Sequence, residues 1–498
     1  MTKPNVKAHF ATRSGFGINA FTDKELEAIH FATLQVLKNT GIKIESEKAL
    51  DIFHAAGARV ERHGDHGIVK IPNYIVEDCI RWTPRNGCFY GRRPEDDYIT
   101  NGTRVSFSAG FGEHVNIIDI DTQKIRPTVK ADVADITRIQ DYLDVISVVE
   151  RAACSGDKYP DTQPLHNYEA MVNNTSKHCF LGFGGGRNAK KIIEIAEIAG
   201  GGVKNFQNRP IVTAFVCPTS PLTLVRDCCE TIMESATNGA GIAAISMSLS
   251  GASSPATLGG VVVQHNAEVL SALILAQLTR KGTPFTYCGC STIMDMQLGT
   301  SPVGVPENAL LTVATVKMAQ YYQLPSWVGG GGSDSKLPDA QQAYDFSLTA
   351  MPAALAGANV IYGIGAIESI LTFDYAAMIT DAEQAERILR VVGGIEINDE
   401  SMVLDVIHEV GPGGEFLSHE HTYRHMKQMS QAKLFDRRTR ESWLEAAGGK
   451  DLSQRAYEEA KRIMTTHKPM ALPDGAGEAI KDLIKEYEAE LKAEKSSN

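Results

Sequence analysis

Aromatic side chains recur where apolar strands are predicted to end, and they are the residues with the clearest chemical use. The positions are Phe183, Phe215, Tyr287, Trp327, Tyr362 and, on the helix after the sixth predicted strand, Tyr344. A quaternary ammonium group has no N–H to donate and is held by the π-faces of rings and a diffuse negative field. Each ring alone is more often a core residue, but together they predict a cage for an alkylated ammonium cation.

Other reactive patterns are weaker. Gly184-Gly-Gly186 precedes a helix without matching either common phosphate-binding motif, and there is no G-x-S-x-G nucleophile elbow. His419, His421 and His425 come closest to a metal-binding cluster, but a spacing of two residues does not place them on one helix face. The nine cysteines are odd in number and scattered through apolar stretches, so we expect buried, reduced thiols.

The rings need a scaffold, and after about residue 145 the sequence repeats a unit of apolar strand, glycine- or serine-rich loop and helix. The strands that can be placed are VISVVERAAC, HCFLGFG, PIVTAFVC, IAAISMSLS, PFTYCGC, LPSWVGG and NVIYGIG. An eighth strand, which the pattern does not locate, would close an α/β fold of the (β/α)8 TIM barrel type, although an open doubly wound sheet shows the same alternation. In a barrel, the site lies at the C-terminal mouths of the strands.

The rest of the chain predicts two additions to this barrel. Residues 1–135 are predicted to form an N-terminal α+β domain, in which Thr22 starts an amphipathic helix and Gly41 stops it. The segment RVSFSAGF followed by HVNIIDIDTQKIRP predicts a hairpin in that domain. Residues 136–400 would hold the barrel, and residues 401–498 a helical C-terminal segment that completes and caps it.

Composition and charge exclude several classes of protein. The chain has 498 residues, of which 43% are hydrophobic and 22% charged, so it is neither disordered nor fibrous. Its formal charge of −11, without a basic run, argues against nucleic acid as a partner. The first residues lack the apolar stretch of a signal peptide, and no window reaches about 18 apolar residues, so we expect a cytoplasmic protein that does not bind a membrane.

Three stretches carry a resemblance to a known family. FTDKELEAIHFATLQVLKNTGIKIESEKALDIF, LPSWVGGGGSDSKLPDAQQAYD and GPGGEFLSHEHT are similar to members of the trimethylamine methyltransferase family, in particular those without pyrrolysine. The resemblance implies a (β/α)8 barrel that passes a methyl group from a methylated amine to the cobalt of a separate corrinoid protein, which enters the barrel mouth. The corrinoid would be supplied by that partner, and no metal is assigned to the chain itself.

The resemblance also bears on the substrate. The trimethylamine enzymes carry pyrrolysine in the loop after the sixth strand, whereas Gly329 to Lys336 contains ordinary residues only. This difference favours quaternary amines such as glycine betaine, proline betaine, carnitine or γ-butyrobetaine. A quaternary nitrogen leaves as a neutral amine without a general acid, so catalysis reduces to alignment and exclusion of water. A strong fixed anion would stabilise the ground state more than the transition state, so rings suit the nitrogen better than carboxylates.

Within this hypothesis, individual residues have expected roles. The rings expected to form the cage are Trp327, Tyr344, Tyr362 and Phe183, with Phe107 or Phe111 reaching in from the N-terminal hairpin. The groups expected to bind a substrate carboxylate are the amides of Gly330, Gly331 and Gly332 and the side chains of His419, His421 or Arg151. Asp334 and Glu368 are expected to steady loops or to face the corrinoid protein.

Two other functions compete with this one. A metal-dependent barrel lyase or hydrolase would use His419, His421 and a carboxylate. A non-catalytic betaine-binding protein would keep the cage and lack turnover. In every case, apolar helices of this number favour a homo-oligomer.

Overall fold

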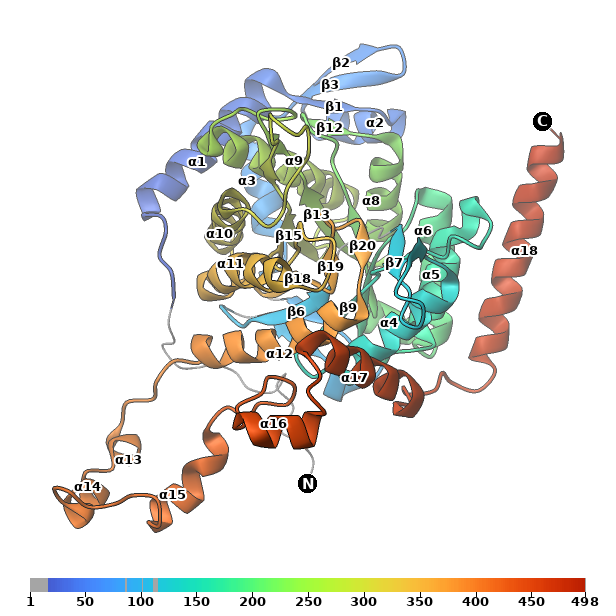
Figure 1. Ribbon diagram of the computed structural model, residues 1–498. Helices are drawn as coiled ribbons and strands as arrows, with labels where there is room; N and C mark the ends of the chain where they lie inside the picture. Colours follow the sequence, from blue (N-terminus) through green and yellow to red (C-terminus); the bar gives the residue numbers. More distant parts are fainter. Residues whose placement is uncertain (1–16, 86, 101, 111–114, 498) are drawn as a thin grey trace.

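The structure is a computed structural model that describes residues 17–85, 87–100, 102–110 and 115–497. Its centre is a parallel eight-stranded sheet rolled into a barrel and surrounded by helices (Figure 1). The strands are β6 (Ser106–Ala109), β9 (Val148–Glu150), β10 (His178–Gly182), β11 (Val212–Val216), β13 (Gly241–Ser246), β15 (Phe285–Gly289), β17 (Ser326–Gly329) and β18 (Val360–Ile364). They pair in the order β6-β18-β17-β15-β13-β11-β10-β9, and a parallel bridge between Phe107 and Ile146 brings β6 and β9 together. The predicted (β/α)8 barrel is confirmed.

Seven strands lie where the sequence predicted them, and β6 is the eighth. The prediction of a hairpin between β6 and the next segment was wrong, because β6 pairs in parallel with β18, with Ser108 opposite Tyr362. The hairpin consists instead of β7 (Asn116–Ile118) and β8 (Ile125–Pro127). The barrel therefore takes its first strand from the region expected to form the N-terminal domain, and the strand that carries Trp327 is the seventh rather than the sixth.

A helix follows each barrel strand and covers the outside of the sheet. These helices are α4 (Lys130–Tyr142), α5 (Gln163–Val172), α6 (Gly186–Ala199), α8 (Arg226–Asn238), α9 (Leu258–Thr279), α10 (Pro306–Tyr321), α11 (Ala340–Ala356) and α12 (Tyr375–Val392). A short helix, α7 (Val203–Asn208), lies between α6 and β11. The repeating pattern of the sequence predicted α5, α6, α8, α9, α10 and α11, but not α4 or α7.

The N-terminal region packs on one side of the barrel. Its elements are α1 (Asp23–Gln35), a π-helical turn (Val36–Thr40), β1 (Ile42–Ile44), α2 (Glu47–Ala55), β2 (Arg59–His63), β3 (His66–Lys70) and α3 (Asn73–Trp82). Thr22 and Glu25 form the predicted capping box, and Gly41 with a φ of 84° ends the helical stretch. Because α1 and α3 contact α9, and β12 (Thr223–Leu224) from a barrel loop pairs with β1, this region shares its apolar core with the barrel.

A small hairpin closes the barrel at the N-terminal ends of its strands. β4 (Gly87–Phe89) and β5 (Tyr98–Thr100) flank a 3-10 turn (Pro94–Asp96), and they carry two buried rings. Phe89 packs against Phe180 of β10 with ring centroids 5.0 Å apart, and the Tyr98 hydroxyl donates to the Asn359 carbonyl oxygen at 2.8 Å. These contacts form a floor beneath the barrel interior.

Short strands lie at the opposite end of the barrel, beyond the C-terminal ends of the barrel strands. β14 (Leu249–Ser250) pairs with β16 (Thr292–Ile293), while β19 (Ala366–Ile367) and β20 (Thr372–Phe373) join β7 and β8 in a second sheet. These pairs hold the loops after β13, β15, β18 and β6 against one another, which gives the barrel mouth a fixed rim.

Helix α9 is long and apolar enough to cross a membrane by length and composition alone. However, 72% of its most apolar window is buried inside the molecule, which is the packing of a core helix. It contacts α1, α2, α3, α8 and α10.

The C-terminal segment contributes helices to the outside of the barrel. They are α13 (Asp399–Met402), α14 (Leu404–Val410), α15 (Glu420–His425), a 3-10 turn (Met426–Gln428), α16 (Arg440–Ala447), α17 (Leu452–Thr466) and α18 (Ala476–Ser497). Helix α17 packs against α12 and α4, and α18 packs against α5 and α6. The segment thus extends the helical layer and supplies, in its described part, helices rather than a barrel strand.

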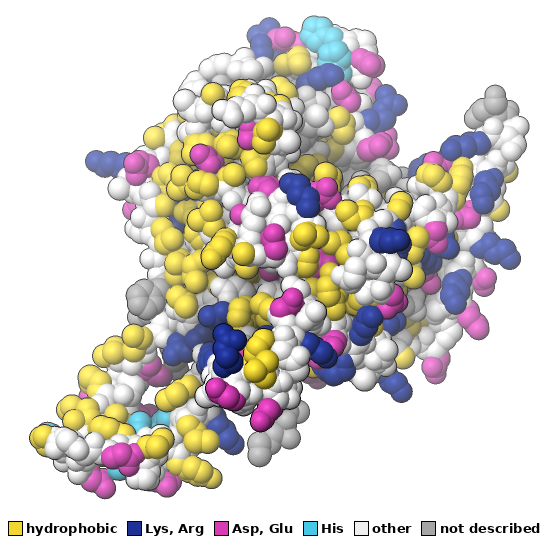
Figure 2. All heavy atoms as spheres, viewed as in Figure 1, with side chains coloured by type: hydrophobic (Ala, Val, Ile, Leu, Met, Phe, Trp, Pro, Cys, Tyr) yellow, Lys and Arg dark blue, Asp and Glu magenta, His cyan; other side chains and the backbone are white. Residues whose placement is uncertain are grey.

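Residues 395–430, called the arm below, extend away from the body (Figure 1). In the part of the chain that the structure describes, α13, α14 and α15 contain no buried residue. Apolar side chains gather on the arm (Figure 2), among them Ile395, Leu417 and Tyr423, which are 73%, 83% and 72% exposed. Apolar surface exposed to this degree is typical of sites that contact a protein, a membrane or a ligand.

Candidate active site

The inside of the barrel is lined by side chains that alternate along the strands. Inward positions of the strands contribute Val148, Phe180, Phe215, Ala243, Ile245, Cys288, Trp327, Val360 and Tyr362 to one buried cluster. The rings of the floor, Phe89 and Tyr98, belong to the same cluster, as does Cys290 at the mouth. This lumen is therefore mainly apolar and aromatic, and it runs from the floor hairpin to the mouth.

Trp327 and Tyr362 are the predicted cage rings that the structure brings together. Their ring centroids lie 4.4 Å apart, and their side chains are 0% and 1% exposed. Phe215 stacks on Trp327 with ring centroids 6.0 Å apart, and the Phe180 ring lies 5.8 Å from Trp327. The upper lumen is thus a cluster of four rings centred on Trp327.

A cavity of 300 Å³ lies at the mouth, above these rings. It is lined by Met247, Leu249, Cys290, Thr292, Ser301, Val303, Ser369 and Ile370, which all follow the C-terminal ends of barrel strands. Cys290 connects the cavity to the rings, because its thiol is hydrogen bonded with Tyr362. The absence of a side chain at Gly329 makes room for this contact, since a Cβ there would lie 2.9 Å from the Tyr362 hydroxyl. The volume suits a small organic ligand.

The lumen also holds a carboxyl group that the sequence analysis missed. Glu150 is the last residue of β9, is 0% exposed, and accepts a hydrogen bond from the Ser108 hydroxyl at 3.0 Å. Its charge contributes to the raised pKa values of Tyr362, Cys288 and Cys290, although burial is the main cause. The available signal was an acidic residue inside the apolar strand VISVVERAAC.

The thiols of the lumen are protonated at neutral pH. Burial raises the pKa of Cys290 to about 11 and that of Cys288 further. All nine cysteines lie in the described part of the chain as thiols. A protonated thiol is a weak nucleophile, so the two lumenal cysteines serve as small, soft lining groups.

The other predicted cage residues lie elsewhere. Phe107 and Phe183 are buried, but they belong to the core between the sheet and the helices, where Phe107 packs against Phe346 of α11. Tyr344, the fifth residue of α11, is 75% exposed. Phe111 lies outside the described residues. Side chains alternate between the two faces of a strand, so Phe107 and Phe183, which each follow an inward position, point to the helices.

The glycines after β17 have a packing role. A Cβ on Gly363 of β18 would lie 2.6 Å from backbone atoms of Gly331 and Gly332, so the two chains touch backbone to backbone. The amide of Gly330 donates to the Tyr362 carbonyl oxygen at 3.1 Å, which removes it as a donor for a substrate carboxylate. Glycine is required here because of this close approach and because φ is +136° at Gly331 and +133° at Gly363.

Asp334 and Glu368 both form hydrogen bonds within the loops at the mouth. The Asp334 carboxylate accepts hydrogen bonds from the amides of Val303 and Gly304, each at 2.9 Å, and from the Ser369 hydroxyl at 2.8 Å. Glu368 accepts from the Thr372 hydroxyl at 2.5 Å. Asp334 therefore connects the loops that follow β15, β17 and β18.

Asp381 of α12 fixes the turn after β18 and gives a testable pH dependence. Its carboxyl accepts from the Gly365 amide at 3.0 Å and from the Gln342 side-chain amide at 2.6 Å, and burial raises its pKa to about 8. Between about pH 4 and about pH 8 the folded protein keeps a proton that the unfolded chain has lost. Stability should therefore fall as pH rises through this window, by up to about 1.4 kcal/mol per unit.

We expect Asp381→Asn to flatten this dependence, because an amide keeps both contacts once the Gln342 amide reverses. The measurement is the unfolding free energy from denaturant titrations at pH 5 and pH 8. Equal pH slopes for the two proteins would contradict the assignment.

The remaining predicted donors are not gathered at the mouth. Arg151 follows β9 directly, and its guanidinium donates to the Cys154 sulfur at 2.9 Å. His419 and His421 lie in the arm, where His419 approaches Glu409 at 3.4 Å and His421 stacks on His425 at 4.2 Å. Barrel helices run antiparallel to the strands, so the arm leaves the end of α12 on the face opposite the mouth. The structure does not bring these histidines to the mouth of their own chain.

No group of three or more His, Cys, Asp or Glu residues suited to a metal ion occurs among the described residues. Among the described residues, His419 and His421 therefore do not form a group of three possible metal ligands with a carboxylate.

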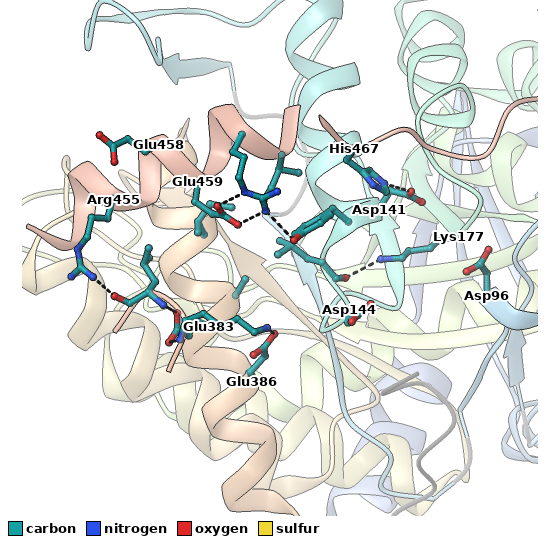
Figure 3. Close-up of a pocket in the computed structure, with 18 of the residues that line it drawn as sticks. Asp96, Asp141, Asp144, Lys177, Glu383, Glu386, Arg455, Glu458, Glu459 and His467 are labelled. Carbon is teal, nitrogen blue, oxygen red and sulfur yellow. Dashed lines mark hydrogen bonds and ion pairs between the residues drawn. The ribbon is translucent and has the colours of Figure 1, made fainter. Parts of the chain in front are cut away.

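A larger cavity of 890 Å³ lies on the other face of the barrel (Figure 3). Its lining comes from the end of α4, from α12, from α17 and from the segment that precedes β10. The charged groups there hold structure: His467 bonds Asp141 at 2.7 Å, and Lys177 donates to the Leu143 carbonyl oxygen at 2.9 Å. Since barrel enzymes work at the C-terminal face, we assign this cavity to the junction between the barrel and α17.

The closed barrel, the aromatic lumen and the ligand-sized cavity at the mouth define a (β/α)8-barrel enzyme. The chain belongs to the trimethylamine methyltransferase (MTTB) family, which its sequence matches over residues 2–492. It is a methyltransferase, and both the predicted family and the predicted enzyme class are confirmed.

Named relatives cover nearly the whole chain. A trimethylamine methyltransferase of Desulfitobacterium hafniense (strain DSM 10664 / DCB-2) is 48% identical over 485 residues, 97% of either chain. A glycine betaine methyltransferase of Desulfitobacterium hafniense (strain Y51) is 30% identical over 91% of this chain and 94% of its own. Among solved structures, the monomethylamine methyltransferase of Methanosarcina barkeri gives a TM-score of 0.49 at 11% identity and covers 92% of this chain and 96% of its own.

Proposed function

We propose that the chain moves a methyl group from a small quaternary amine of the betaine type to Co(I) of a separate corrinoid protein. The observation that carries this proposal is the buried pair of Trp327 and Tyr362 beneath the cavity at the mouth. Aromatic faces bind a cation that has no N–H, and they do so without a donor that a quaternary nitrogen would leave unsatisfied. The glycine betaine methyltransferase relative supports this substrate class, because glycine betaine is a quaternary amine.

In the proposed reaction, the protein positions and dries the reacting centre. The C–N bond of the substrate breaks, its electron pair leaves with nitrogen as a neutral tertiary amine, and the acceptor's Co(I) supplies the pair for the new bond to the methyl carbon. The rings around Trp327 orient the ammonium head, and the apolar lining of Cys290, Val303 and Ile370 excludes water from it. No proton is transferred, so the buried thiols and hydroxyls take no part in the reaction.

The loop after β17 supports a quaternary substrate over trimethylamine. Its glycines are occupied by backbone packing against Gly363, and its polar side chains Ser333 and Asp334 are occupied by bonds within the rim. A tertiary amine needs activation of its nitrogen before the methyl group can leave, whereas a quaternary nitrogen already carries the charge. The 48% identical trimethylamine methyltransferase makes trimethylamine the second candidate, which the same experiment tests.

The experiment is an anaerobic methyl-transfer assay on the intact chain. Corrinoid protein or free cobalamin, reduced to Co(I), is mixed with enzyme and one amine at a time, and the cobalt absorption reports methylation. We expect methylation with one of glycine betaine, proline betaine, carnitine and γ-butyrobetaine, and none with trimethylamine. Methylation by trimethylamine alone would overturn the proposed substrate, and binding of a betaine without methylation would favour a betaine-binding protein.

The acceptor and the assembly are part of the proposal. The rim of the mouth exposes Met247, Met296, Leu298 and Leu371, at 40%, 70%, 76% and 53%, which suits docking of a protein face. We propose a cytoplasmic homo-oligomer in which the apolar arm is covered by another copy of the chain. Light scattering of the intact protein measures the subunit number.

A further inference from the structure

Glu150 is placed by the barrel where its carboxyl faces the lumen. It ends β9, two residues after the inward-facing Val148, and pairs in register with Phe180 of β10. Along a strand, residues two apart point to the same side, so Glu150 points inward as Val148 does. The carboxyl thus lies in the upper part of the lumen rather than among the helices.

Its position is fixed from two directions. The side chain of Gln140 on α4 clamps the backbone of Glu150, donating to its carbonyl oxygen at 2.8 Å and accepting from its amide at 3.0 Å. The Ser108 hydroxyl of β6 holds the carboxylate oxygen at 3.0 Å. Such a carboxyl keeps its place without the motion that a surface glutamate would have.

The carboxyl faces the same lumen as the aromatic pair. Ser108, to which it is bonded, is the register partner of Tyr362, and the Tyr362 ring lies 4.4 Å from Trp327. One strand, β6, therefore lies between the strand that carries Glu150 and the strand that carries Tyr362. The influence of Glu150 on the pKa values of Tyr362 and Cys290 agrees with this placement.

We infer that Glu150 is a positioning residue that selects a positively charged substrate by attracting its ammonium group to the rings. The inference deepens the proposed function and rests on it. It follows from the place of the carboxyl and the sign of its charge: in an apolar lumen, a negative charge is attracted to a cation far more strongly than in water. A neutral molecule of the same shape gains nothing from it.

The same chemistry predicts how the effect divides between binding and turnover. The positive charge on nitrogen is lost as the methyl group leaves, so the carboxylate stabilises the bound substrate more than the transition state. Glu150→Gln should therefore weaken binding and raise KM, while kcat stays equal or rises. A group with a purely structural role would lower kcat or folding yield instead.

The hydrogen bond between Glu150 and Ser108 also links β9 to β6. The substitution must therefore remove the negative charge and keep this hydrogen bond. Glutamine keeps the shape and an oxygen that accepts from Ser108, so the seam between the strands is preserved. Glu169→Gln is the matched control, because Glu169 is 6% exposed on α5 and is paired with Lys130 outside the lumen.

The test measures binding by calorimetry for two pairs of probes. Glycine betaine is compared with 3,3-dimethylbutanoate, and γ-butyrobetaine with 5,5-dimethylhexanoate, in which a carbon atom replaces the charged nitrogen. We expect the wild-type chain and Glu169→Gln to prefer the cation of at least one pair by tenfold or more, and Glu150→Gln to lose most of that preference. Preference unchanged in Glu150→Gln overturns the inference while the proposed function stands. Failure of the wild-type chain to bind any of the four probes, or proline betaine or carnitine in the same assay, overturns the proposed function, and the inference with it.

Discussion

Trp327→Ala should lower kcat/KM for methyl transfer by at least about 100-fold. Trp327 lies at the centre of the ring cluster, with Tyr362 at 4.4 Å, Phe180 at 5.8 Å and Phe215 at 6.0 Å. A cation over a desolvated ring is stabilised by about 2 kcal/mol, which accounts for about 30-fold. The remaining loss comes from misalignment, because a shift of about 1 Å at the reacting carbon costs up to about 100-fold.

The variant also loses a buried side chain, so folding must be measured beside activity. Truncation of a buried tryptophan costs about 3–5 kcal/mol of stability. Trp327→Phe keeps an aromatic face and much of the volume, and we expect it to recover a large part of the rate. Trp82→Ala, on half-buried α3 with Lys281 over its ring at 4.7 Å, controls for the loss of a tryptophan remote from the lumen. An unchanged rate in a folded Trp327→Ala protein would remove this residue from the site.

Gly363→Ala should destabilise the protein by more than about 4 kcal/mol, a large effect for the addition of one methyl group. The new Cβ would lie 2.6 Å from the Gly331 carbonyl carbon and from the Gly332 nitrogen, and neither backbone atom can rotate aside. The φ of +133° at Gly363 adds strain that an L side chain rarely accepts. We expect β18 and the loop after β17 to separate, which would disturb the mouth as well as lower stability.

Gly282→Ala is the control that separates the effect of the steric clash at Gly363 from the effect of a positive φ. Gly282 also has a positive φ, of +84°, but a Cβ there meets nothing within 4 Å. It should cost about 1 kcal/mol, the price of the backbone conformation alone. Denaturant unfolding of both variants gives the comparison, and similar losses at the two positions would show that close approach at Gly363 is not the reason for its glycine.

The repeated strand and helix units of the barrel could be predicted from the sequence. The short strand β6 could not. Apolar strands such as HCFLGFG were placed correctly because they are buried on both faces. β6 has only four residues, Ser106–Ala109, and its alternation of serine with apolar residues is that of a hairpin strand with one face in water. Its pairing with β18, about 250 positions away, leaves no local trace.

The site was predicted in the same uneven way. Trp327 and Tyr362 sit inside clear strands, so their inward direction followed from the barrel, whereas Phe183 lies one residue beyond β10 and points to the helices. Tyr344 and the arm histidines depend on how helices and the arm leave the barrel, which strand patterns do not determine. Glu150 was not among the predicted site residues, although a carboxyl inside an apolar strand is itself unusual.

The floor formed by β4 and β5 closes one end of the lumen, so ligands can enter and leave only at the other end. With Phe89 and Tyr98 closing the N-terminal end, what enters at the mouth must leave at the mouth. If an acceptor protein docks there, as the proposed function requires, it covers that entrance. We therefore expect the methyl donor to bind before the acceptor and the demethylated amine to leave after it, and we expect a large excess of acceptor to inhibit the reaction by blocking entry of the donor.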